Sequence, residues 1–527
     1  MDDSPTQNVV YLDEDSAPRY LHYAEDFITY RFPAGTRVLY PNAPLKPIAH
    51  RKAAIRQALN NPEGCEPLFA QLEPGMKVTI AVDDISVPLP PMKTPDIRQE
   101  MLEVVLDMLT DYGVEDVHIV VALALHRRMT DAEIERMVGS KIFNAYAPDR
   151  LYNMDAEEPD GMVILGETRH GEEVEIIRRA AESDLLIYVN INFVPMNGGF
   201  KSIGTGLSGY RGIRHHHNPE TIRKSNSYMD PEKSALYSSN TRMGKIINEK
   251  INVFHIETTL NNKMYDDSLN FLARNEDQWS GADWAKFKSM QFALERLPRN
   301  LKRTVFHKIP ADYGLVGVHA GKTQLVHEKT LEKCWKQHAL KVKGQADVVV
   351  YGIPFESPYN VNSVLNPLLV RVMALGYFFN MYRNHPLVKK GGTLIVTHPC
   401  YDDFDPEHHP SYIEFFNRCL PETRDAFELQ SRWEEEFAHN PNYVEMYRRG
   451  NAYHGVHPFY MWYWAAHAMD HVDEVIWVGA DRRTAQRLGF RAASTLADAL
   501  EMASGTVGPS PSITYLHNPP HLIADVK

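Results

Sequence analysis

Short apolar runs alternate with stretches of helical periodicity along the first half of the chain. The runs at 77–82, 117–122 and 185–189 are rich in valine, isoleucine and leucine, as buried strands are. Between the first two, residues 94–112 carry apolar side chains at helical spacing, with Thr94 predicted as the N-cap. Strands that alternate with helices predict a parallel sheet covered by helices, and ligands then bind at the carboxyl ends of the strands.

The second half repeats this alternation, and its apolar runs predict a second sheet. We expect two Rossmann-like α/β lobes with parallel-rich sheets and an active-site cleft between them, because clefts between domains are favoured ligand sites. The expected domains are a catalytic lobe at 1–300 and a lobe at 301–527 that closes the cleft, with a last segment able to pack back on the first lobe. Residues 1–45 are polar and proline-punctuated and predict a lead-in, and the basic stretch at 296–303 predicts a break between helices. The strands predicted here are 347–351, 393–397, 474–478 and 512–516, with helices near 361–382, 421–437, 481–488 and 495–503.

A glycine-rich segment, residues 194–218, follows the third predicted strand. It holds six glycines, one lysine and three consecutive histidines at 215–217. Glycines let the backbone approach a ligand, the Lys201 amine can pair with an anion or form a covalent bond, and imidazoles bind metals. Three adjacent histidines cannot all face one metal, so at most two would be ligands. Phe200 between Gly199 and Lys201 breaks the pattern of a P-loop, although the N–H groups can still cradle a phosphate.

Polar residues also follow the other two predicted strands of the first half. Asp83 and Asp84 follow one, and His126 follows the other. Each has a structural reading: the aspartates as braces of the turn before Pro88, and His126 as a satisfied histidine at a strand end. Because the ends of parallel strands share one edge of a sheet, these residues and the glycine-rich segment are expected to meet at one site.

Two clusters in the second half carry weaker signals. His398, Cys400 and the pair at 408–409 resemble pieces of a zinc site, but their spacing fits no standard ligand pattern. The aromatic run at 460–464 predicts a packing helix or the wall of a pocket.

Composition narrows the class of protein. The 527 residues include 56 basic and 68 acidic ones, a net charge of −12 without a long basic stretch, which argues against a nucleic-acid binder. The four cysteines are scattered and form no CxxC pair, as in a reduced compartment. No apolar run approaches the ~20 residues of a membrane span, and no signal peptide is visible at the start. We therefore expect a soluble, cytoplasmic protein that binds neither membranes nor nucleic acid.

Three motifs resemble those of the nickel-pincer lactate racemase family, and the resemblance extends over most of the chain. Residues 125–130 (LHRRMT) are similar to the family's Gly-x-His-Arg-x-Met-Thr. Residues 198–203 (GGFKSI) match Gly-Gly-x-Lys-Ser-Ile, and His217 follows at the family's interval. Residues 84–88 (DISVP) stand where the family usually has Asp-x-Thr-Arg-Pro.

The resemblance implies a racemase or epimerase of a small 2-hydroxy acid that transfers hydride to and from a bound cofactor. This cofactor is a pyridinium-3-thioamide-5-thiocarboxylic acid mononucleotide with Ni(II), supplied by cofactor-synthesis enzymes. Lys201 would be its covalent tether, His217 the nickel ligand and His126 the general acid/base. A homo-oligomer is left open. Other residues implied at the cofactor are Asp84, Ser86, Gly198, Gly199 and Ser202, while Arg127 is a candidate for the substrate carboxylate on chemical grounds.

The chain departs from the family pattern in places that bear on catalysis. Val87 replaces the usual arginine, and the stretch before the glycines, 190–195, lacks the family's second acid/base histidine. Asn192 lies there instead and can hydrogen-bond a substrate but cannot exchange a proton at neutral pH. The family's lysine is also missing from 356–365. We therefore expect a one-base epimerase of a different, larger hydroxy acid. The alternatives are a metal-assisted hydrolase or lyase, and a non-catalytic binder of a small anion or nucleotide.

Overall fold

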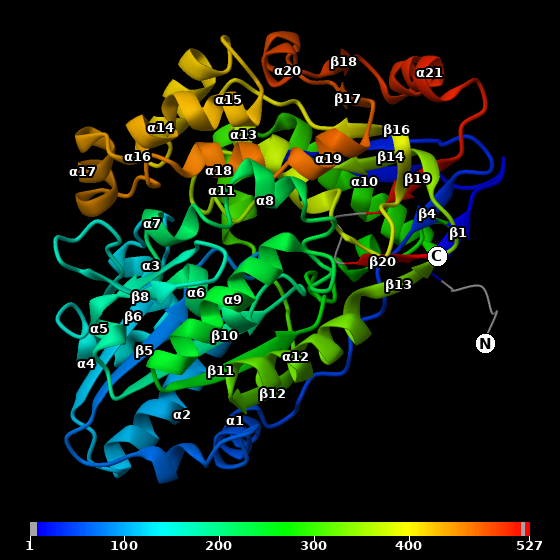
Figure 1. The fold of residues 1–527 in the computed structure, drawn as a ribbon. Coiled ribbons are helices and arrows are strands. Elements are labelled where there is room, and N and C mark those ends of the chain that lie inside the picture. Colours follow the sequence, from blue (N-terminus) through cyan, green and yellow to red (C-terminus); the bar gives the residue numbers. More distant parts are fainter. Residues whose placement is uncertain (1–7, 518–521) are drawn as a thin grey trace.

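The first of two main sheets has six strands and contains the three strands predicted in the first half. The computed structural model describes residues 8–517 and 522–527 and is drawn in Figure 1. Its strand order is β12-β11-β10-β5-β6-β7, and all neighbours are parallel except β11 and β12. The strands are β5 (Lys77–Asp83), β6 (Asp116–Ala122), β7 (Leu151–Asn153), β10 (Leu185–Asn192), β11 (Val253–Leu260) and β12 (Leu315–Gly321).

Helices cover both faces of this sheet. Alternate side chains of a strand point to opposite faces, so Ile80 and Val82 join the core with α1 and α2, while Ala81 faces the core that includes α6 and α9. The helices are α1 (Arg51–Asn60), α2 (Ile97–Asp111), α3 (Asp131–Val138), α4 (Ser140–Tyr146), α5 (Arg178–Ala181), α6 (Gly199–Gly206), α7 (Tyr210–Ile213), α8 (Pro219–Arg223), α9 (Ala235–Lys250) and α12 (Thr323–His338), with a 3-10 turn η1 (Leu68–Gln71) and a hairpin of β8 (Met162–Glu167) and β9 (Glu173–Ile177).

The start of α2 differs from the prediction. The N-cap is Asp96 and not Thr94, because the Asp96 carboxylate accepts a hydrogen bond from the Arg98 N–H at the free end of the helix. Thr130 caps the next helix, since its side chain and that of Glu133 form a capping box at the start of α3.

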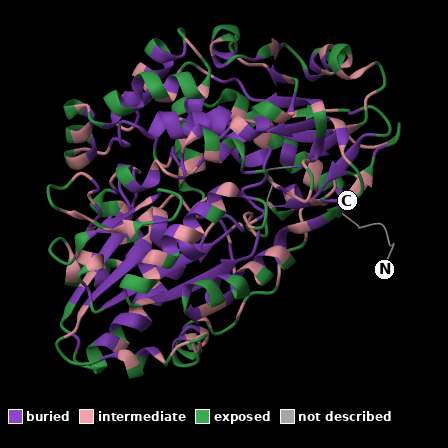
Figure 2. Cartoon of the chain, in the orientation of Figure 1, coloured by how far each residue is buried: buried purple, intermediate pink, exposed green. Residues whose placement is uncertain are grey.

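The second sheet has seven strands in the order β1-β4-β19-β14-β16-β17-β18. All neighbours are parallel except β1 and β4, and the four predicted strands of this half are confirmed. Figure 2 shows the strands of both sheets buried beneath helices whose outer sides are exposed. The strands are β1 (Val9–Tyr11), β4 (Arg37–Leu39), β14 (Ala346–Gly352), β16 (Val388–Thr397), β17 (Glu474–Val478), β18 (Arg491–Ala493) and β19 (Ile513–Leu516). The predicted α/β class with parallel-rich sheets is thus confirmed.

From residue 8 onward, the segment predicted as a polar lead-in contributes strands to the second sheet, and residues 1–7 lie outside the described residues. β4 pairs with β19, and β2 (Arg19–Tyr23) and β3 (Asp26–Tyr30) form a hairpin that contacts β14. In the other direction, β12 and α12 lie beyond residue 300 but pack on the first sheet. The two sheets therefore do not correspond to a division of the chain at residue 300, because each contains strands from both sides of that position.

The basic stretch predicted to break helices is itself mostly helical. α10 (Gly281–Arg296) ends two residues before Pro298, and α11 (Arg299–Lys308) begins immediately after it. A proline breaks a helix when it lies in the interior but is tolerated at the start of a helix.

The last strand, β20 (Ile523–Val526), lies between β13 (Ala339–Val342) and β15 (Tyr382–Arg383).

The helices of the second half cover its sheet. The two long predicted helices are interrupted by wider, π-helical turns, and the aromatic run at 460–464 is buried in and just after α18, as a packing helix. The helices of the second half, with their π-helical turns, are α13 (Pro367–Arg371) with η4 (Val372–Phe378), α14 (Pro410–Glu414) with η5 (Phe415–Cys419), α15 (Ala426–Leu429) with η6 (Gln430–Glu434) and α16 (Glu435–Ala438), α17 (Pro441–Arg449), α18 (His457–Tyr463), α19 (Ala466–His471), α20 (Arg482–Leu488) and α21 (Leu496–Val507). Two 3-10 turns, η2 (Asn270–Ala273) and η3 (Glu276–Gln278), precede α10. In the part of the chain that the structure describes, no helix is both long and apolar enough to cross a bilayer.

Candidate active site

A cavity of about 630 Å³ lies where strands of both sheets end. The loops after β5, β6 and β10 line it from the first sheet, and the loop after β14, the η4 turn and Trp464 line it from the second. Ligand sites at the carboxyl ends of parallel strands are the expectation for such sheets. The residues that the sequence placed at one site, Asp83, Asp84, His126, Lys201 and His217, all line this cavity.

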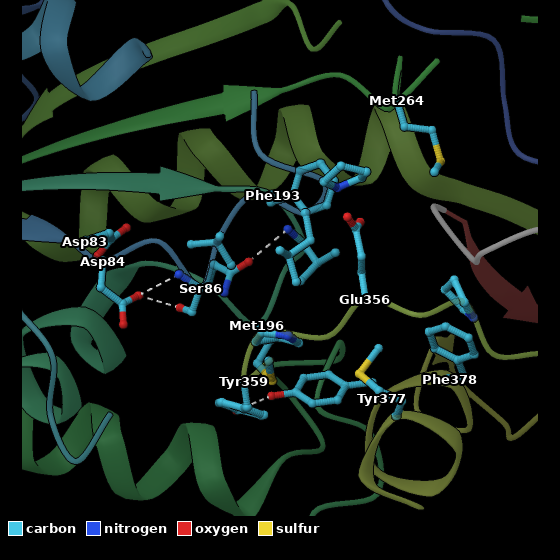
Figure 3. Close-up of a pocket in the computed structure, with 18 of the residues that line it drawn as sticks. Asp83, Asp84, Ser86, Phe193, Met196, Met264, Glu356, Tyr359, Tyr377 and Phe378 are labelled. Atoms are coloured by element: carbon cyan, nitrogen blue, oxygen red, sulfur yellow. Dashed lines mark hydrogen bonds between the residues drawn. The ribbon is translucent and has the colours of Figure 1, made fainter. Parts of the chain in front are cut away.

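Asp84 orients the imidazole of His126. The Asp84 Oδ2 atom lies 2.8 Å from His126 Nδ1, and Asp84 Oδ1 accepts hydrogen bonds from the backbone N–H and the hydroxyl of Ser86, as Figure 3 shows. Burial disfavours the Asp84 carboxylate, but His126 and Ser86 outweigh it and lower the pKa of Asp84. An ionised Asp84 holds the proton of His126 on Nδ1, which leaves Nε2 as the basic nitrogen.

Asp83 lies beside this pair and has a different environment. Its carboxylate accepts hydrogen bonds from the Ile191 N–H, at 2.8 Å, and from the Tyr188 hydroxyl, at 3.2 Å. Burial nevertheless raises the pKa of Asp83 to about 7. Asp83 therefore braces the end of β10, whereas the turn before Pro88, which the structural reading assigned to one of the two aspartates, is braced by Asp84 through Ser86.

Lys201 lies near the start of α6, directly after a turn whose backbone conformation favours glycine. Gly198 and Gly199 have φ values of 92° and 62°, in the left-handed region. A Cβ atom would lie 2.7 Å from Glu257 Oε1 at Gly198, and 2.7 Å from the His327 ring at Gly199. Lys201 is half-buried in the cavity wall, and desolvation lowers the pKa of its amine although Asp83 and Asp84 oppose this. A desolvated amine is more often neutral and nucleophilic.

A buried carboxylate that sequence reasoning missed holds this turn in place. Glu257 on β11 accepts a hydrogen bond from the Gly199 N–H and lies 3.1 Å from His327 Nδ1. Burial disfavours the Glu257 carboxylate, but His327, His255 and the Gly199 N–H outweigh it and lower the pKa of Glu257 to about 2. No spacing in the sequence links Glu257 to His327, which lies 70 residues away on α12.

The three consecutive histidines have three different surroundings. His217 lines the cavity and packs against Tyr460 and Trp464, while its Nδ1 lies 2.6 Å from Nδ1 of the fully buried His216. His215 is part-exposed, 3.9 Å from Glu173. Burial lowers the pKa of His217 well below its ordinary value, so its imidazole is neutral. Of these three histidines, His217 is therefore the one that offers its remaining ring nitrogen, Nε2, to the cavity.

Two predicted site residues have other partners. The Arg127 guanidinium is buried against Glu133, at 2.7 and 3.0 Å, and donates to the Val361 carbonyl at 3.0 Å. The N–H groups of the Arg127 guanidinium are therefore already bonded and join the two halves of the chain. The predicted contact with a substrate carboxylate is wrong. Asn192 is also fully buried, and its amide donates to the Asn197 carbonyl at 2.9 Å, closing the turn after β10. Neither residue lines the cavity.

The remaining implied cofactor residues divide in the same way. Ser86, Gly198 and Ser202 line the cavity, and Ser202 Oγ lies 2.6 Å from the Asn190 side chain. Gly199 does not line it, because its N–H is bonded to Glu257. Among residues 8–517 and 522–527, no group of three or more His, Cys, Asp and Glu side chains is arranged to hold a metal ion.

Most of the cavity wall is apolar, and a third carboxyl group, besides those of Asp83 and Asp84, stands within it. Figure 3 shows Phe193, Met196, Met264 and Phe378 around the space, with Glu356 extending into it from the loop after β14. Helices α10 and α11 add further apolar side chains to the wall. Local sequence patterns assign no role to Glu356 or to these apolar residues, because the walls at this end of the cavity come from segments far apart in the chain.

The fold and the cavity define a two-sheet α/β protein with a half-buried lysine and a neutral histidine at one site. Residues 23–230 match the lactate racemase N-terminal domain family. The lactate racemase of Lactiplantibacillus plantarum is 27% identical over 173 residues, which are 32% of this chain and 38% of that one. The lactate racemase of Thermoanaerobacterium thermosaccharolyticum is 26% identical over 174 residues, with the same shares. The alignments thus span well under half of either relative.

Solved structures extend the likeness in fold to nearly the whole chain. The apoprotein of the Thermoanaerobacterium thermosaccharolyticum lactate racemase superposes with a TM-score of 0.61 at 17% identity, over 96% of this chain and all of that one. A protein from Thermotoga maritima gives a TM-score of 0.51 at 14% identity, over 92% of this chain and all of that one. The resemblance to the lactate racemase family is confirmed, by sequence over residues 23–230 and by fold over most of the chain.

Proposed function

We propose that this chain is a racemase or epimerase of a 2-hydroxy acid that works with a nickel-pincer nucleotide tethered to Lys201. The observation that carries the proposal is that Lys201 and His217, from the glycine-rich segment, and His126, from a different segment of the chain, line one cavity. When bound, the cofactor supplies a centre that takes hydride from a carbon atom and returns it.

The residues of the cavity suit this cofactor. Acylation to a thioamide requires the neutral form of a lysine amine, and desolvation lowers the pKa of Lys201 in the direction that favours this form. A neutral imidazole with its Nδ1 already engaged presents Nε2 to a metal, and nitrogen beside sulfur donors suits Ni(II). The rigid glycine turn held by Glu257 keeps the lysine directed at the cavity, which limits the motion of a tethered group.

His126 moves the proton in this proposal. The substrate hydroxyl would donate its proton to His126 Nε2, while Asp84 accepts the hydrogen bond from Nδ1 and stabilises the imidazolium that forms. The lowered pKa of Asp84 keeps that carboxylate ionised at neutral pH.

The substrate would be larger and more apolar than lactate. The wall opposite Lys201 includes Phe193, Met264 and Phe378, together with side chains of α10 and α11. A methyl group buries little of such a wall, whereas each further CH₂ gains about 0.8 kcal/mol on burial. A linear, branched or aromatic apolar substituent on the 2-hydroxy acid therefore fits the cavity.

Isotope retention during enantiomer interconversion tests the function. Protein made together with the cofactor-synthesis enzymes would be given single enantiomers of 2-hydroxy acids that carry deuterium at the α-carbon, in ordinary water. Hydride that leaves and returns within one site keeps the label in the inverted product. Loss of the label to solvent would contradict the hydride mechanism, and a loaded protein that inverts no 2-hydroxy acid would favour the non-catalytic binder.

A further inference from the structure

Glu356 is a carboxyl group in the cavity that the proposed roles do not use. It follows β14 of the second sheet, whereas His126 and Lys201 follow strands of the first sheet. Within residues 8–517 and 522–527, neither a hydrogen bond nor an ion pair engages its carboxyl group, although its charge acts on the Tyr313 hydroxyl. Polar groups left without partners inside a cavity are candidates for contact with a ligand.

The surroundings of Glu356 favour its neutral form. Burial among apolar side chains raises the pKa of Glu356 to about 8, so at neutral pH the group is mostly a carboxylic acid. A protonated carboxyl group can donate a hydrogen bond to an oxygen atom and then exchange that proton. The other titratable groups that line the cavity are His22, Asp83, Asp84, His126, Tyr188, Lys201, His217, Tyr265, Lys286, Tyr359 and Tyr377.

Among the described residues that the first sheet places at the cavity, His126 is the one oriented for proton exchange with the substrate hydroxyl, because the Asp83 carboxyl group is bonded to Ile191 and Tyr188. His126 is held for this role by Asp84, whereas Asn192, at the place of the missing second histidine, is buried and turned toward Asn197. Inversion at the α-carbon presents the hydroxyl in two orientations, one for each enantiomer. A second proton-exchanging group from the second sheet would serve the second orientation.

We propose that Glu356 is this second acid/base residue, exchanging a proton with the hydroxyl of one enantiomer while His126 serves the other. The role rests on the proposed function. The hydroxyl of the first enantiomer would give its proton to His126 Nε2, and a bound cofactor would supply the centre that takes and returns the α-hydrogen as hydride, with a 2-keto acid as the intermediate substrate species. The ketone oxygen would take a proton from Glu356, which becomes a carboxylate. The reverse reaction, or proton exchange of His126 and Glu356 with solvent, restores both groups.

Half-reactions with single enantiomers test the role. Cofactor-loaded wild type, Glu356→Gln and His126→Gln would each be mixed with either enantiomer and quenched, and the 2-keto acid measured. We expect Glu356→Gln to form keto acid from one enantiomer only, and His126→Gln from the other only. Both variants should interconvert enantiomers at least about 100-fold more slowly than wild type. Glu501→Gln, an exposed glutamate on α21, is the matched control and should behave as wild type.

Each outcome bears on one of the two proposals. Glu356→Gln that forms keto acid from both enantiomers, or from neither while nickel and the Lys201 modification are retained, would overturn the role of Glu356 alone. Wild type that forms keto acid from neither enantiomer would overturn the proposed function and this role with it. Infrared difference spectra of the protein without cofactor give an independent check. The component of the protonated-carboxyl band that titrates with a pKa of about 8 should vanish in Glu356→Gln and persist in Glu501→Gln, while the component of Asp83, with a pKa of about 7, should remain in both.

Discussion

Replacing Glu257 by glutamine should destabilise the protein and loosen the turn that carries Lys201. The carboxylate is fully buried and bonds the Gly199 N–H and His327, so glutamine keeps the shape but removes the charge. The pKa of Glu257 is lowered from 4.5 to about 2, and at about 1.4 kcal/mol per unit this corresponds to about 3 kcal/mol. Loss of one partner from a buried ion pair typically costs a similar amount, about 3–5 kcal/mol.

Urea unfolding at several pH values measures this effect. Because the folded pKa of Glu257 lies below its ordinary value, its stabilisation is complete above pH 4.5 and disappears as the pH falls through 2. The gap in unfolding free energy between wild type and Glu257→Gln should therefore be about 3 kcal/mol at pH 7 and shrink below pH 4.5. Glu328→Gln, at an exposed position next to His327 on α12, should change little. A gap at pH 7 below about 1 kcal/mol, or one that grows on acidification, would refute the reasoning.

Three further substitutions separate the roles of the site residues. Gly199→Ala should lower the unfolding free energy by about 1–3 kcal/mol in urea titrations, because its φ is 62° and the new Cβ would contact His327. Gly505→Ala, in helix α21 with nothing within 4 Å, should instead be neutral or raise it by up to about 1 kcal/mol. Asp84→Asn should slow enantiomer interconversion about 100-fold or more at unchanged nickel content, because the tautomer of the catalytic imidazole is no longer held; an unaffected rate would contradict this. His217→Ala should lose nickel, measured by elemental analysis, while the lysine modification persists.

The buried strands were predictable because burial requires a run of apolar residues, which is visible in the local sequence. β5, β6, β10 and the four central strands of the second sheet are apolar runs that can be found without knowing their partners. β1 and β4 have three residues each, and β4 joins the sheet through β19, more than 470 residues further along the chain. Such a short strand is stabilised by its neighbours, so its own residues carry too little pattern to predict it.

The site was predictable where one motif carried the chemistry and not where distant segments meet. Lys201, His126 and His217 were found through local spacing, and the structure brings them to one cavity. Glu257 and Glu356 were missed because their significance depends on what the fold packs around them. Arg127, in contrast, was predicted to contact the substrate, but its guanidinium is bonded to Glu133, the glutamate of the capping box at the start of α3.

The covalent state of Lys201 tests the central claim most directly. Protein made together with the cofactor-synthesis enzymes would be digested, and the peptide that contains residue 201 analysed by mass spectrometry, with Lys201→Arg as the matched control. The account predicts a mass increase equal to the pincer nucleotide on the wild-type peptide, one nickel per chain, and neither in Lys201→Arg. An unmodified wild-type peptide without nickel, from cells that load a known lactate racemase, would contradict it.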